Sequence, residues 1–518
     1  MTSLMEEMAP HTLSHPRHVV FTRVIGARSH QSPIRSNPSI PANILHHICL
    51  AVEDGQGDAL TRKHQKNLNI LAMMGVSRSW RDDIVGFNDL FGDIAFDTSN
   101  SRMIATATRI LQITKAKTTE LQVFIRSTSH DLVDNTKLQV TAEELLCHLG
   151  LQSSRFVYFE LQSQSSHLSS YFNLPAPKLR FLRHGCNMTP VLFSSLFPNL
   201  RTLDTYVNEV FRTLPSALFN LVELRLINSH RTRRFSMESV LTSLRDAHRL
   251  EVLQLSGFAR FSCVSTAVES VELANLKSAQ FTDCHLPELL PRLHFPQLCE
   301  FSFHGFDLAP DENTPPFMVT NTDFFSPLQG CPLPILDQRA LTHIIISVDN
   351  KDDKIEFTLR LMSGPPGPKH QFVITMAWEK WTIWEEHLKQ LIRGAVERVR
   401  FASSICLYLL HHIDHTLAPY LPLLRLPQIS VLCTSGWFTP VAFKLLTDSA
   451  DITCPPPLPR LKCFCFRGGD LHISAEEVQL LVERCLQSRF NGRRPLAIRR
   501  WVLHGGETCL ITPFRITY

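Results

Sequence analysis

The 518-residue sequence lacks the short motifs that mark the common kinds of catalytic and cofactor site. It has no G-x-S-x-G nucleophile turn, and it has no glycine-rich phosphate loop of the G-x-x-x-x-G-K-S/T or G-x-G-x-x-G type. None of its 14 cysteines belongs to a Cys-x-x-Cys pair, which is the usual core of a structural zinc site. We therefore expect no catalytic residues, no cofactor and no metal site in this chain.

Long apolar runs and a large excess of charge are also missing. No stretch approaches the roughly 18–20 apolar residues that a membrane helix needs, and residues 1–38 have no signal-peptide pattern. A net charge of +4 does not indicate a nucleic-acid binder. We expect a cytoplasmic or nuclear protein with reduced thiols, without nucleic-acid or membrane partners, and with residues 1–38 forming a disordered tail.

Histidine and tryptophan residues in the C-terminal half leave another interpretation open. His411 and His415 would share one face of a helix, as two metal ligands can, but no further ligand accompanies them. Trp381 and Trp384 have i, i+3 spacing, which fits a packed core better than a ligand platform. Surface or core packing is the simpler interpretation, and a hydrolase within residues 340–518 is the alternative.

Two short helices are predicted at the start of the folded part. Ile44, Leu45 and Ile48 follow a proline that suits the first turn of a helix, and their spacing places them on one helical face. Residues 53–66 are polar and include two glycines, so we expect a loop there. A second amphipathic helix is predicted over residues 68–80.

A short apolar pattern recurs from about residue 115 onward. Cores of the L-x-x-L-x-L type begin at residues 179, 200, 221, 250, 276 and 298, which are 21, 21, 29, 26 and 22 residues apart. Partial copies begin at residues 121 and 156. Leucine-rich repeats are about 20–29 residues long. One such unit cannot bury its own apolar face, so stacked units must share a continuous core.

The repeat pattern is interrupted over residues 307–394, where we expect an irregular insertion of three strands and a helix. Repeat-like strands are predicted to return at residues 396–401, 429–434, 461–466 and 498–503. The sequence thus predicts an α/β fold, in which a small N-terminal helical module precedes a degenerate, irregular leucine-rich-repeat-like solenoid. The expected ranges are 39–96 for the helical module, 110–306 for the repeats and 395–518 for the C-terminal repeat-like region.

The helical module carries a recognisable motif. It reads I-P-x-x-I-L-x-x-I over residues 40–48, then V-S-R-S-W over residues 76–80, then Leu90. This resembles the F-box family, whose pattern is L-P-x-E-I-L-x-x-I, then V-(S/C)-(R/K)-x-W and a closing Leu or Trp. The chain looks most like the F-box proteins that are abundant in mushroom-forming (basidiomycete) fungi. It departs from the pattern at Ile40 and Asn43, where the family has Leu and Glu, and in a longer loop between the helices.

The resemblance implies the substrate-receptor subunit of an SCF-type (cullin-RING) ubiquitin ligase, which is not itself an enzyme. The F-box would bind a Skp-family adaptor, and through it a cullin, while the repeats would bind a target protein. The residues expected to bind the adaptor, or in part to hold the box together, are Ile40, Pro41, Ile44, Leu45, Ile48, Val76, Trp80 and Leu90. A repeat scaffold unconnected with ubiquitylation and a small-molecule receptor are the alternatives.

The repeats also predict where a target protein would bind. Side chains alternate along a strand, so the residue between the last two apolar positions of each copy points away from the core. Stacked copies would place these residues in one column on the sheet. The predicted substrate-binding residues are Arg183, Asp204, Arg225, Gln254, Gln280 and Ser302. A solvated face without a partner is the alternative interpretation, and the alternating charges suit a protein better than a nucleic-acid backbone.

Overall fold

The computed structural model describes most of the chain between residues 40 and 513. The described residues are 40–51, 58–87, 89–115, 119–127, 136–163, 168, 171–172, 174–185, 197–206, 219–228, 235–258, 261–262, 270–284, 286–306, 341–351, 354–363, 371–379, 384–400, 402–411, 420–436, 438, 461, 463–467, 497–504 and 508–513. The tail predicted at residues 1–38 lies outside them.

One large sheet organises the described part of the chain. It contains 17 strands, and most neighbouring strands are parallel. In spatial order these are β1 (Asp93–Asp97), β2 (Leu121–Ser127), β3 (Phe156–Ser163), β4 (Phe181–His184), β5 (Thr202–Tyr206), β6 (Glu223–Ile227), β8 (Val252–Ser256), β11 (Ser278–Thr282), β13 (Glu300–Phe306), β16 (Gln371–Glu379), β15 (Lys354–Ser363), β14 (Leu341–Lys351), β17 (Ile405–His411), β18 (Ile429–Gly436), β19 (Cys463–Arg467), β20 (Ala497–His504) and β21 (Thr508–Pro513).

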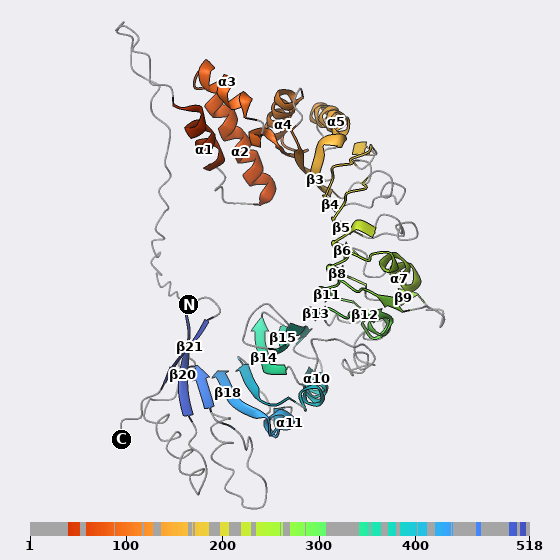
Figure 1. Ribbon diagram of the computed structural model, residues 1–518, viewed down its shortest axis with the longest axis vertical. Coiled ribbons are helices and arrows are strands. Elements are labelled where there is room, and N and C mark those ends of the chain that lie inside the picture. The colour runs from red at the N-terminus through yellow and green to blue at the C-terminus, as the bar shows by residue number, and fades with distance from the viewer. Residues whose placement is uncertain are drawn as a thin grey trace, which may run out of the picture.

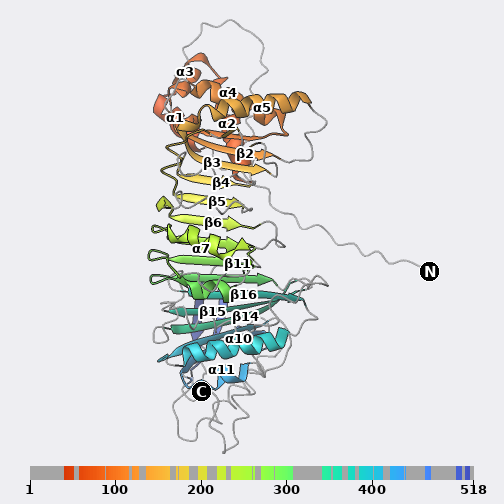
Figure 2. The ribbon, with the colours of Figure 1, turned by 90° about the vertical axis from the view of Figure 1, so that its right-hand side faces the viewer.

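The sheet curves into an arc with helices along its outer side, and the helices of residues 42–86 lie at one end of the arc (Figure 1, Figure 2). The inner, concave side of the arc is formed by the strands. The helices are α1 (Ala42–Ala51), α2 (Ala59–Met74), α3 (Arg78–Gly86), α4 (Ser101–Thr114), α5 (Thr136–Gly150), α7 (Met237–Arg245), α8 (Leu286–Leu289), α10 (Trp384–Val399) and α11 (Leu421–Leu424). Two small sheets, β7 (Phe235–Ser236) with β9 (Phe261–Ser262) and β10 (Val271–Glu272) with β12 (Leu293–His294), complete the described elements. The fold is therefore mixed α/β, as predicted.

The repeated leucines explain why the strands stack. The first apolar position of each full copy is almost completely buried, from Leu179 to Leu298, and the fourth position is buried as well. Leu224, for example, lies in the same core as Leu241 and Leu244 of α7. Burying one leucine side chain contributes about 1.5–3 kcal/mol, so the repeated leucines are a main source of the free energy that holds neighbouring units together.

A ladder of side-chain amides joins successive units where their strands begin. Asn199, Asn220 and Asn275 each precede the first leucine of a copy, and each donates to a backbone carbonyl of the unit before it. The acceptors are the carbonyls of Pro177 at 2.7 Å, Pro198 at 3.0 Å and His248 at 2.6 Å. The amides therefore hydrogen-bond to backbone carbonyls that are not paired within the sheet, and these bonds fix the spacing between neighbouring units.

The segment expected to interrupt the array is instead built into the sheet. Strands β14, β15 and β16 form an antiparallel group, with β16 parallel to β13 and β14 parallel to β17. The three predicted strands are present. The repeat-like strand predicted at residues 396–401 is wrong, because residues 396–399 belong to α10. Leu388, Ile392, Ala395 and Val399 are buried at helical spacing, and the strand of this unit is β17.

The N-terminal helices differ from the predicted ones in two respects. Residues 59–66 are helical rather than a loop, because Asp58 caps α2 by accepting from the Thr61 amide. The predicted second helix is divided after Met74, and Ser77 caps α3 by accepting from the Trp80 amide. In α1, Leu45 is buried whereas Ile44 and Ile48 are exposed, so of these three residues only Leu45 packs into the core.

A buried ion pair fastens the helices to the sheet. Asp93, at the start of β1, accepts from the ammonium groups of Lys66 at 3.0 Å and Lys63 at 3.2 Å, and its backbone carbonyl accepts from Asn67 at 2.9 Å. The Lys66 and Asp93 side chains are each 6% exposed. Because α2 supplies all three donors, it is held at a fixed position on the first strand of the sheet.

Candidate binding face of the sheet

The six residues predicted to form a column lie side by side on six neighbouring strands. Arg183 pairs with Asp204 in the strand register, Asp204 with Arg225, and Arg225 with Gln254. Gln254 then pairs with Gln280, and Gln280 with Ser302. Their buried neighbours face the helix layer, so alternation directs these six toward the concave side. We call this set, together with Glu160, the polar column.

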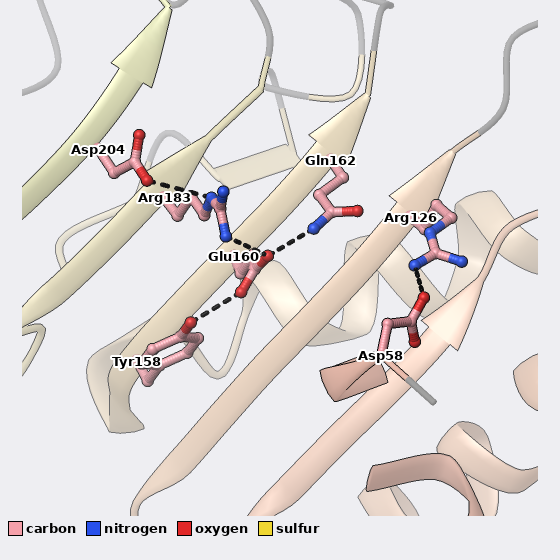
Figure 3. Close-up of polar contacts among 7 residues, drawn as sticks. All are labelled: Asp58, Arg126, Tyr158, Glu160, Gln162, Arg183 and Asp204. Atoms are coloured by element: carbon pink, nitrogen blue, oxygen red, sulfur yellow. Dashed lines mark hydrogen bonds and ion pairs between the residues drawn. The ribbon is translucent and has the colours of Figure 1, made fainter. Parts of the chain in front are cut away.

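Glu160 on β3 extends the polar column and is its most connected residue. It pairs with Arg183 in the register. Its carboxylate accepts from the Tyr158 hydroxyl at 2.7 Å and from the Gln162 amide at 2.6 Å, and the Arg183 guanidinium lies 3.4 Å away. Figure 3 shows these side chains converging on Glu160. Burial, then the hydrogen bond to Glu160, raises the pKa of Tyr158, so this hydroxyl stays a donor.

Arg183 bridges two carboxylates that lie beneath it. Its Nη1 meets Glu160, and its Nε lies 3.2 Å from Oδ2 of Asp204 (Figure 3). The Arg183 side chain is 48% exposed, whereas those of Glu160 and Asp204 are 8% and 7% exposed. Burial raises the pKa of Asp204, and the neighbouring Arg183 and Arg225 partly oppose this rise. The surface that a partner meets here is therefore mainly guanidinium.

A cavity of about 160 Å³ opens on the concave face at the centre of the polar column. Its lining includes Arg183, Asp204, Arg225, Gln254 and Gln280. Drug-sized ligands occupy pockets of about 300–1,000 Å³, so this cavity has room for a side chain rather than for a small-molecule ligand. The small-molecule receptor considered from the sequence has no support from this cavity.

Tyr158, Glu160 and Gln162 were missed by sequence reasoning, although a signal was present. The copy that begins at Phe156 has Glu160 at the same position as Arg183 in the next copy. In the copy before it, the predicted alignment is wrong by one residue: Phe124, taken as a core position, pairs with Glu160, and Val123 pairs with Phe159. An irregularity between Leu121 and Gln122 causes this offset.

The motif residues of the helical module divide into two groups. Leu45 and Leu90 are buried, and Ile40 and Trp80 are partly buried against the core. The other group reaches the surface: Ile44 is 47% exposed, Ile48 is 41% exposed, Val76 is 63% exposed, and Pro41 is also exposed. Ile44 and Ile48 are four residues apart in α1, so they lie on one helix face.

The other candidates from the sequence are not assembled into a site. His411 is the last residue of a strand, β17, so the predicted helix face shared with His415 does not begin there, and His415 lies outside the described residues. Trp384 begins α10, and Trp381 is likewise outside the described residues. Among the residues that the structure describes, no group of three or more His, Cys, Asp or Glu could hold a metal ion.

Comparison with known proteins adds no family assignment. No protein-family model matches the chain, and no curated protein matches it significantly. The likeness to the F-box family thus rests on the motif residues between positions 40 and 90. In the part of the chain that the structure describes, no helix is both long and apolar enough to cross a membrane.

Proposed function

We propose that the chain is the substrate-receptor subunit of an SCF-type ubiquitin ligase, with an F-box over residues 39–96 and a leucine-rich-repeat-like solenoid after it. The observation that carries the proposal is the exposed pair Ile44 and Ile48 on α1, which occupies motif positions while the neighbouring Leu45 holds the core. Exposed isoleucines on one helix face are costly to leave in water and suit a groove on a partner. A Skp-family adaptor is the partner that the motif favours.

The concave face supports the second half of the proposal. An array of short parallel strands offers a long, rigid surface, and the polar column gives it alternating charges that suit a protein target. The receptor would act by proximity in the cytoplasm or the nucleus. It would hold a target lysine near a ubiquitin-conjugating enzyme that the cullin recruits, which raises the effective concentration of the lysine. Such a function needs no nucleophile in this chain.

Adaptor capture by single-residue variants tests the proposal. We expect Ile44→Asp to abolish recovery of a purified Skp-family adaptor, because binding would have to bury an unpaired carboxylate. Val140→Asp is the matched control, since Val140 is an exposed apolar residue (53%) on a different helix, α5. It should leave adaptor recovery unchanged. Equal recovery with the two variants, or none with the natural chain, would contradict the F-box assignment.

A second measurement distinguishes the proposed ligase subunit from a repeat scaffold unconnected with ubiquitylation. Co-purification from cells should bring down a cullin together with the adaptor, and the Ile44→Asp chain should lose both. Recovery of the adaptor without a cullin would favour the scaffold. Trp80 is a poorer probe than Ile44, because it packs partly against the core and its truncation would also destabilise the module.

A further inference from the structure

We propose that the cavity beside Arg225 binds one carboxylate side chain, an aspartate or a glutamate, of the partner protein. This rests on the proposed function only in taking that partner to be the ligase substrate. Hydrogen-bond donors surround the cavity. They come from three adjacent strands, β6, β8 and β11.

Arg225 is held in place and still has donors to offer. Its Nε lies 2.7 Å from Oε1 of Glu223, and its Nη2 meets the same oxygen. A guanidinium has five N–H groups, so this carboxylate leaves Nη1 and one N–H of Nη2 for a ligand. The Arg225 side chain is 43% exposed and that of Glu223 is 25% exposed. The carboxylate thus orients the guanidinium from one side and leaves the cavity side open.

Two amides complete the set of donors. Gln254 and Gln280 line the cavity, pair in the strand register and are partly buried. Their side chains have no hydrogen-bond partner within the described residues, whereas the amide of Gln162, two residues after Glu160 on β3, donates to Glu160. An amide N–H from each, together with Nη1 of Arg225, can converge on the two oxygens of one carboxylate.

Charge decides which acidic group fits. The charged side chains that these ion pairs join are three carboxylates (Glu160, Asp204 and Glu223) and two guanidiniums (Arg183 and Arg225), so their net charge is −1. A phosphate of charge near −2 would meet a field without excess positive charge. A single carboxylate needs only the exposed guanidinium of Arg225. A lysine would have to pass two guanidiniums to reach Glu160 and Asp204, which are almost fully buried.

Selecting a library of displayed peptides for binding to the full-length chain tests the proposal. Enriched peptides should carry Asp or Glu at one fixed position, and a synthetic binder should then lose affinity about tenfold when that residue becomes Gln. Arg225→Gln should weaken the same binder about tenfold. Arg201→Gln is the matched control, because Arg201 is exposed and lies just before β5, outside the cavity lining. It should leave the affinity unchanged.

A double-mutant cycle gives the decisive result. If Arg225 contacts the peptide carboxylate, the Glu→Gln peptide should lose no further affinity for the Arg225→Gln chain. Additive losses, a preference for lysine, a stronger binder with phosphoserine at that position, or a selection that yields no peptide would each overturn the proposal. The Ile44→Asp chain should keep the peptide preference. Failure of adaptor binding and failure of carboxylate recognition are therefore seen separately.

Discussion

Removing the carboxylate of Asp93 should destabilise the junction between the helices and the sheet far more than removing its partner Lys66. Asp93→Ala removes the carboxylate that the buried ammonium of Lys66 meets at 3.0 Å, and breaking a buried pair in this way costs about 3–5 kcal/mol. Lys63 contributes less to the loss, because its side chain is 28% exposed and can turn to solvent. The bond from Asn67 to the backbone of residue 93 survives the change. We therefore expect Asp93→Ala to lower the free energy of unfolding by about 3 kcal/mol.

Lys66→Met should cost about 1 kcal/mol or less, because Asp93 keeps Lys63 and methionine fills similar space. The double variant should be more stable than Asp93→Ala alone, since the buried ammonium is then removed together with its carboxylate. Urea denaturation gives the free energies, and amide hydrogen exchange in α2 and β1 locates the effect. If Asp93→Ala and the double variant were equally stable, the pair would not be the source of the stability and this reasoning would fail.

Three further predictions concern other parts of the chain. Gly257→Ala should cost about 2 kcal/mol or more in urea denaturation, because Gly257 has φ of +77° and an added Cβ would collide with the Asn228 carbonyl; a neutral change would contradict the backbone geometry. The pKa of Asp58 is lowered from 3.8 to about 2, chiefly by its hydrogen bond with Arg126. The pair therefore stabilises the chain fully above pH 3.8, and this contribution is lost as the pH falls through about 2. Asp58→Asn should be slightly less stable than the natural chain at pH 6 and should approach its stability as the pH falls to about 2 and below, as melting temperatures would show. Burial raises the pKa of Cys284 to about 12, so iodoacetamide at pH 8 should label exposed Cys147 but spare Cys284 until the chain is unfolded, as peptide mass spectrometry can verify.

The strands that form the polar column could be predicted because leucine spacing determines both register and facing. Leu203 and Leu224 must be buried, so Asp204 and Arg225 must face the other side, and the parallel pairing then aligns them. The binding role of the column has no comparable sequence signal. Whether an exposed polar residue meets a partner depends on the donors left free around it, which only the three-dimensional contacts reveal.

The wrong secondary-structure predictions fall in segments that fit two periodicities or in which a helix is mostly polar. Val396 and Val399 fit both the repeat pattern and a helix face, and packing of α10 against the core decided between them. Residues 59–66 are mostly polar, and only Leu60 and Lys66 among them are buried, so composition alone suggested a loop. At Leu121 one irregular pairing shifts the alternation, and sequence spacing cannot register such a shift.

The arrangement of β14, β15 and β16 has a consequence for how such arrays can change length. In an antiparallel group of three strands the first and third run the same way, so the group can enter a parallel sheet without reversing the strands on either side. A group of two or four strands would leave one neighbour pointing the wrong way. Antiparallel groups inserted within this sheet should therefore contain odd numbers of strands, and removal of this one would present β13 and β17 to each other in the direction that parallel pairing requires.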